Sequence, residues 1–151
     1  MMESRNEYYM RRALYEAGKA MDNDEVPVGA IVVFENKIIA KGFNMCLRLN
    51  DPTAHAEMQV ITSACDYLES RYLNDCELYV TLEPCPMCAG AMFWAQLGHV
   101  IFGTNDEKRG FSTINKNLIH PKTKVTSGVL KHECSKLLSD FFKKKRKLKE
   151  N

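Results

Sequence analysis

No stretch of this chain is apolar for long enough to cross a membrane. A transmembrane helix needs about 20 predominantly apolar residues, and polar or charged side chains interrupt every hydrophobic run well before that length. Residues 1–12 are polar and charged, so they lack the apolar core of a secretory signal peptide. We therefore expect no membrane association and a cytoplasmic location.

The chain also has no internal repeat, no linker and no low-complexity segment apart from a basic tail. With 151 residues, 45% of them hydrophobic, it is long enough to bury a proper core. We expect a single domain over residues 1–151. In a reducing compartment its six cysteines are expected to be free thiols or metal ligands, not a disulfide framework.

The net charge of +2 is unevenly distributed. Residues 143–151 carry six basic side chains and one acidic one, a local charge of +5 that leaves about −3 for the remainder. Such a tail could attract a phosphate backbone. It could equally be a solvated helix end whose cations complement the negative pole of the helix dipole. The tail alone leaves both interpretations open.

Hydrophobic periodicity predicts alternating helices and strands. Helices are expected over residues 10–21, 53–68, 86–97 and 133–151, and strands over 30–34, 37–41, 77–82, 100–103 and 124–126, the first two joined by a tight turn at Glu35-Asn36. This alternation predicts the α/β class, as a three-layer α/β/α sandwich around a mixed five-stranded sheet. The long polar segment 104–123 is expected to be a functional loop.

His55-Ala56-Glu57, followed after twenty-six residues by Pro84-Cys85-Pro86-Met87-Cys88, is the most informative pattern. His-x-Glu followed by Pro-Cys-x-x-Cys is the signature of zinc enzymes that deaminate nucleobases. Three protein ligands leave the fourth position of a catalytic zinc to water. We expect His55, Cys85 and Cys88 to bind one Zn²⁺ per subunit and Glu57 to carry protons as the general acid and base.

Spacing supports this hypothesis. Cys85 and Cys88, three apart, share one face of the first turn of a helix, and Pro86 suits its first position. His55 follows Asp51-Pro52, another cap-plus-proline helix start. Two helix N-termini would then direct their positive ends at the metal. On a regular helix His55 and Glu57 would point apart, so the metal is expected near the end of that helix.

Each part of the pattern has an ordinary alternative. A lone Cys-x-x-Cys could be a redox pair, half of a structural zinc site or two core cysteines. A structural site would need a fourth ligand, which Cys76 or His99 could supply. The order and combination of the residues favour the catalytic interpretation.

The chain resembles the cytidine deaminase-like superfamily, and within it the bacterial TadA-type tRNA adenosine deaminases. The resemblance extends over nearly the whole chain. The matching segments are Glu25-Val26-Pro27-Val28-Gly29-Ala30, Gly42-Phe43-Asn44, and residues 51–57, 78–85, 87–92, 102–106 and 137–142.

This resemblance implies a cytidine deaminase-like fold, a homodimer, and conversion of adenosine to inosine at the wobble position of a tRNA anticodon. It implies that Val28 lines the base pocket, that Asn44 hydrogen-bonds the base, and that Ala54 and the Leu82-Glu83 backbone close around it. The residues it places against the anticodon stem-loop are Asp106 and Lys108, and, in the C-terminal segment, Phe141, Phe142, Lys143, Lys144, Lys145 and Arg146. Each of these residues also has a purely structural alternative. Val28, Phe141 and Phe142 could pack in the core, Asn44 could form a turn, and Asp106 could be an ordinary acidic residue of a loop.

Some features depart from the better-known tRNA enzymes, among them loop residues Arg109 to Asn117. Pro86 stands where they often have valine, and Pro86 and Trp94 are both common in bacterial guanine deaminases. Val26-Pro27-Val28, where guanine deaminases typically have Gly-Pro-Phe, and the basic tail favour the tRNA branch. Deamination of guanine or another free base or nucleoside is therefore the alternative function, and a non-catalytic zinc-binding module is less favoured. Met92, Phe93 and Leu97 could form a dimer interface or fill the core.

Overall fold

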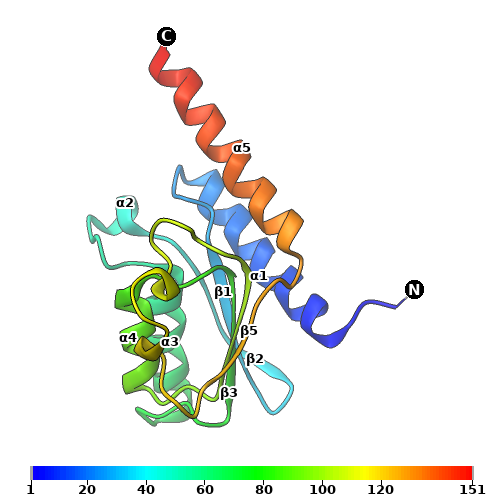
Figure 1. The fold of residues 1–151 in the computed structure, drawn as a ribbon, viewed down its shortest axis with the longest axis vertical. Helices are drawn as coiled ribbons and strands as arrows, with labels where there is room; N and C mark the ends of the chain where they lie inside the picture. Colours follow the sequence, from blue (N-terminus) through cyan, green and yellow to red (C-terminus); the bar gives the residue numbers. More distant parts are fainter. Residues whose placement is uncertain (1, 151) are drawn as a thin grey trace.

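A mixed five-stranded sheet runs through the middle of the fold, with helices on both faces (Figure 1). The computed structural model describes residues 2–150. The strand order is β2-β1-β3-β4-β5, and β1 is antiparallel to β2 and β3, while β4 is parallel to β3 and β5. The strands are β1 (Gly29–Phe34), β2 (Lys37–Phe43), β3 (Cys76–Leu82), β4 (His99–Thr104) and β5 (Lys124–Thr126).

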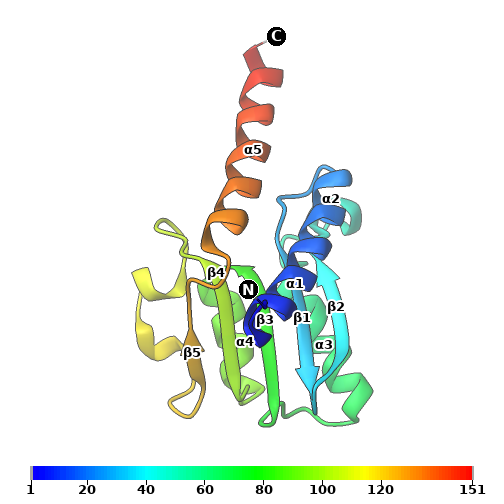
Figure 2. The same ribbon diagram turned by 90° about the vertical axis from the view of Figure 1, so that its right-hand side faces the viewer.

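Helices α1 (Arg5–Asp22) and α5 (Lys131–Glu150) cover one face of the sheet, and α3 (Ala56–Leu68) and α4 (Pro86–Trp94) cover the other (Figure 1). A short helix, α2 (Cys46–Leu49), follows β2, and two 3₁₀ turns, η1 (Phe111–Thr113) and η2 (Lys116–Leu118), interrupt the long loop after β4. Helix α5 extends past the end of the sheet (Figure 2). The predicted α/β/α sandwich around five mixed strands is confirmed.

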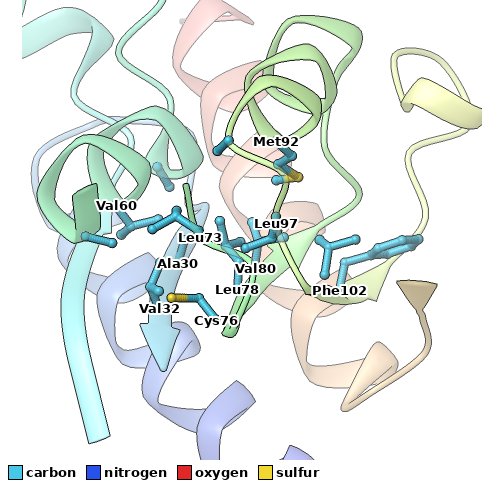
Figure 3. Close-up of a cluster of buried hydrophobic side chains, with 14 of the residues drawn as sticks. Ala30, Val32, Val60, Leu73, Cys76, Leu78, Val80, Met92, Leu97 and Phe102 are labelled. Carbon is cyan, nitrogen blue, oxygen red and sulfur yellow. The ribbon is translucent and has the colours of Figure 1, made fainter. Parts of the chain in front are cut away.

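The central strands are buried on both faces, which explains their continuous apolar sequence. In β1, Ile31 and Val33 pack with α1 and α5, whereas Ala30 and Val32 pack with α3 and α4. The larger cluster, on the α3/α4 face, brings strand residues together with Met92 of α4 (Figure 3). This packing fixes α3 and α4 against the sheet.

The hairpin between β1 and β2 turns at Glu35 and Asn36, as predicted. Both residues have positive φ angles, 50° and 62°. That pair of left-handed residues is the conformation of a type I′ turn, whose twist matches the strands it joins.

The start of α3 differs from the prediction. The helix begins at Ala56, not at residue 53, and His55 is its N-cap. The Asp51 carboxylate instead accepts hydrogen bonds from the backbone N–H (2.8 Å) and hydroxyl (2.7 Å) of Thr53. Asp51-Pro52 therefore stabilises a turn of its own, which resembles a helix cap in sequence.

Other element boundaries shift by a few residues. Helix α4 ends at Trp94, not at residue 97, and α5 begins two residues earlier than predicted, at Lys131. Helix α2 was not predicted. Met1 and Asn151, the ends of the predicted domain, lie outside the described residues. No helix within residues 2–150 combines the length and apolar character needed to span a membrane.

Candidate metal and deaminase site

Three metal-binding side chains converge where helices α3 and α4 begin. His55 is the N-cap of α3, Cys85 is the N-cap of α4, and Cys88 lies in the first turn of α4. His55 Nδ1 lies 3.6 Å from Cys85 Sγ and 3.5 Å from Cys88 Sγ. All three donor atoms lie within 4.8 Å of one another.

The donor set fits zinc. With Zn–S bonds of about 2.3 Å and Zn–N bonds of about 2.0–2.1 Å, tetrahedral ligand atoms stand roughly 3.5 Å apart, as His55 Nδ1 and the two sulfurs do. Cys76 and His99, the candidates for a fourth ligand, lie in β3 and β4 and do not belong to the cluster of the described residues. Three protein ligands are the set expected of a catalytic zinc.

The two thiols and the imidazole lie close enough to shift one another's pKa values. A hydrogen bond from Cys88, with a further one from His55, lowers the pKa of Cys85 to about 4. The hydrogen bond to Cys85 and burial raise the pKa of Cys88, and the hydrogen bond with Cys85 raises the pKa of His55. Metal ligands bind deprotonated, so zinc binding would release the protons that the thiols hold.

The position of His55 explains how His-x-Glu can serve one site. His55 has an extended backbone (φ −72°, ψ 153°), whereas Glu57 is the second residue of the helix proper. His55 lies before the regular helix, so the expectation that His55 and Glu57 point apart does not hold for this pair. The candidate metal site lies at the N-terminal end of α3, as expected from the spacing of His55 and Glu57.

Glu57 is buried, with 4% of its surface exposed. Burial raises the pKa of its carboxyl to about 7, because a charged carboxylate loses its hydration there. A carboxyl group with a pKa near neutrality is suited to both accepting and giving protons.

The residues expected around the base lie against the same two helix ends. The Val28 carbonyl accepts a hydrogen bond from the Asn44 backbone N–H (3.1 Å), and the Asn44 side chain accepts one from Ala56 N–H (2.8 Å). Val28 also belongs to the core cluster, and Ala54 is buried. Asn44 Nδ2 donates to the Val26 carbonyl (3.1 Å).

The loop after β4 contains Asp106 and Lys108. The Asp106 carboxylate accepts hydrogen bonds from the backbone N–H groups of Lys108 (3.1 Å) and Arg109 (3.0 Å), while the Lys108 side chain is exposed. Glu83, whose backbone is expected to close around the base, also buries its side chain against this loop. Sequence reasoning missed that contact because the partners are 22 to 29 residues apart.

The C-terminal residues fall into different environments. Phe141 is buried, whereas Phe142 is 44% exposed. Phe142, Lys143 and Arg146 line a groove of about 300 Å³ between α5 and the end of β4. Lys145 is engaged within the chain, since its Nζ lies 3.6 Å from Asp24 and 5.5 Å from the centre of the Phe141 ring. Lys144 is exposed.

This fold, with three zinc donors at two helix N-termini and a buried glutamate beside them, defines the class of zinc-dependent deaminases. The family model for the cytidine and deoxycytidylate deaminase zinc-binding region matches residues 3–104. The chain belongs to that family.

Within this family, the chain is similar to proteins of known activity. A tRNA-specific adenosine deaminase of Aquifex aeolicus is 46% identical over 145 residues, covering 93% of this chain and 95% of its own. A solved structure from a study of A-to-I editing by tRNA:A34 deaminases superimposes with a TM-score of 0.80 at 39% identity, covering 87% of this chain and 99% of the other. A Bacillus subtilis guanine deaminase structure gives a TM-score of 0.66 at 37% identity, over 75% of this chain and 76% of the other.

Proposed function

We propose that this chain is a zinc-dependent hydrolase that converts adenosine to inosine at the wobble position of a tRNA anticodon. The cluster of His55, Cys85 and Cys88, with Glu57 buried beside it, carries the proposal. The extensive similarity to tRNA-specific adenosine deaminases supports the choice of substrate over free guanine.

In this proposal His55, Cys85 and Cys88 hold one Zn²⁺ per subunit. When bound, zinc lowers the pKa of a water molecule to about 7 and so supplies a nucleophile at neutral pH. Glu57 accepts a proton from the attacking water and gives it to N1 of the adenine ring; it then accepts the proton of the hydroxyl added at C6 and passes it to the departing amine. Water adds at C6, the C6–N bond breaks, and inosine and ammonia are the products.

The target base would enter a pocket formed by Val28, Asn44, Ala54 and Leu82. Among the hydrogen bonds of residues 2–150, the Asn44 amide donates only one, to Val26, so its second N–H is available to the base. Anticodon-loop nucleotides are single-stranded, so extruding one costs less than opening a duplex. Asp106, Lys108 and the α5 residues would contact the neighbouring nucleotides.

We further propose a cytoplasmic homodimer. Trp94 is 79% exposed on α4 and Met87 is 37% exposed, which leaves apolar surface for a second copy. Met92 and Leu97, considered for the interface, instead fill the core, with exposures of 0% and 2%. Light scattering of the purified protein tests the stoichiometry, and Trp94→Glu should shift the protein toward the monomer.

The six cysteines are free, as a reducing compartment allows.

The decisive experiment incubates the zinc-loaded protein with an anticodon stem-loop carrying a wobble adenosine and, separately, with free guanine. We expect inosine from the stem-loop. Conversion of guanine with no inosine would establish the alternative function. Glu57→Ala should retain zinc and lose ammonia release, whereas a non-catalytic zinc-binding module would release no ammonia in either form.

A further inference from the structure

The Glu83 side chain makes contacts that the zinc chemistry does not require. Its surface is only 3% exposed, yet its carboxylate accepts four hydrogen bonds from one loop. Oε1 accepts from Asn105 Nδ2 (3.3 Å) and from the Asp106 backbone N–H (3.1 Å). Oε2 accepts from the backbone N–H (3.0 Å) and the hydroxyl (2.6 Å) of Ser112. A carboxylate has about four acceptor positions, so this loop uses all of them.

The backbone beside Glu83 contacts the same loop. Glu83 N–H donates to the Thr104 carbonyl (2.8 Å), and Phe111 N–H donates to the Pro84 carbonyl (2.9 Å). Glu83 and Pro84 directly precede Cys85. The start and the end of the loop are therefore both joined to the segment that leads into a zinc ligand.

Gly110 shows how closely the loop approaches the carboxylate. A Cβ atom at this position would lie 2.3 Å from Glu83 Cδ and 2.5 Å from each carboxylate oxygen. No side chain fits there unless Glu83 moves. The buried carboxylate and the absent side chain are complementary, which indicates a built contact between Glu83 and the loop.

We infer that Glu83 is a positioning residue, whose side chain sets the place of residues 105–112 relative to the metal site and thereby governs substrate binding. The inference rests on the proposed function, in which Asp106 and Lys108 contact the RNA. Two of the four donors are backbone N–H groups, so losing their acceptor would release the loop backbone itself. Because the partners of the Glu83 carboxylate are residues of the loop, loss of the carboxylate should affect KM more than kcat.

Glu83→Gln tests this inference with little change of shape. On whichever side the amide NH₂ lies, one backbone N–H, that of Asp106 or that of Ser112, would lose its acceptor. We expect zinc content to stay at the wild-type level, KM for the anticodon stem-loop to rise on the order of tenfold, and kcat to change much less. Hydrogen exchange at the amide that loses its acceptor should accelerate.

Glu77→Gln is the matched control. Glu77 lies near the opposite end of β3 and also accepts side-chain hydrogen bonds, from Arg5. Its replacement should lower stability without changing KM or the exchange of the loop amides. A rise in KM with Glu77→Gln equal to that with Glu83→Gln would overturn the inference, since any destabilisation would then suffice.

Further outcomes are equally decisive. Unchanged KM and unchanged exchange in Glu83→Gln would overturn the inference, and so would loss of zinc, which would show that the carboxylate supports the metal site itself. If Glu83→Gln does not fold, Ser112→Ala, which removes only the 2.6 Å bond, should show the same KM effect in weaker form. If the wild-type protein does not convert the stem-loop, the proposed function fails, and hydrogen exchange alone decides whether Glu83 holds the loop.

Discussion

The side-chain oxygen of Asn44 accepts a 2.8 Å hydrogen bond from the backbone N–H of Ala56, the first residue of α3. This bond satisfies one of the N–H groups that a helix leaves without an intrahelical partner. His55 precedes Ala56 and Glu57 follows it. Asn44 therefore fixes the backbone that carries both a metal donor and the proposed proton carrier, besides its proposed contact with the base.

Asn44→Ala should impair both stability and activity. Removing the acceptor of Ala56 N–H is expected to lower the free energy of unfolding by about 1–2 kcal/mol, as loss of a helix cap does. Asn44→Asp keeps an acceptor but no N–H donor, so it should recover part of the stability and none of the activity. Urea denaturation and steady-state kinetics measure the two effects. Wild-type stability in Asn44→Ala would show that the bond contributes no net free energy.

Removal of one zinc ligand should abolish metal binding and activity together. Cys88 is fully buried in the first turn of α4, and Cys88→Ser would leave two of the three donors. Zinc content should fall from one per subunit to near zero, with a lower melting temperature because metal binding stabilises the folded state. Cys65→Ser, outside the cluster, is the control and should retain zinc. A Cys88→Ser protein with full zinc content would contradict the ligand assignment.

The sequence predicted what local patterns determine. The helix start at Pro86, the turn at Glu35-Asn36 and the five strands follow from rules that act over a few residues. The predicted start of α3 was wrong because an aspartate that caps a helix and an aspartate that forms a turn have the same sequence signature. Contacts such as that of Glu83 with Ser112 depend on how distant segments meet, and no periodicity records them.

The ion pair between Arg5 and Glu77 predicts a pH-dependent contribution to stability. The two guanidinium nitrogens donate to the two Glu77 oxygens at 2.8 and 2.7 Å, and these bonds hold the pKa of Glu77 below its ordinary value of 4.5. A depressed carboxyl pKa stabilises the fold above the unfolded-state value, and that stabilisation disappears as the pH falls through the folded-state pKa.

Arg5→Gln tests this contribution. Because Arg5 is 46% exposed, solvent screening limits the expected loss at pH 7 to about 0.5–1 kcal/mol. The difference between wild type and variant should shrink at pH values below 4.5, where Glu77 becomes protonated in both proteins. Denaturation curves at a series of pH values measure it. A difference that stays constant down to pH 3 would mean that packing of the arginine, not its charge, supplies the stability.

The basic residues of α5 should differ in their contribution to RNA binding. Lys143 and Arg146 line the groove near β4 and Lys144 is exposed, whereas Lys145 is paired with Asp24. Each phosphate contact contributes about 0.7 to the slope of log K against log salt for single-stranded nucleic acid. Replacing Lys143, Lys144 and Arg146 by Gln should therefore weaken stem-loop binding and reduce the slope by about 2. Lys145→Gln, the control, should change the slope less per charge, because Lys145 lies 3.6 Å from the Asp24 carboxylate. Binding measured at several salt concentrations separates the two variants. An unchanged slope in the triple variant would assign the basic tail to helix stabilisation, the alternative that its charge pattern left open.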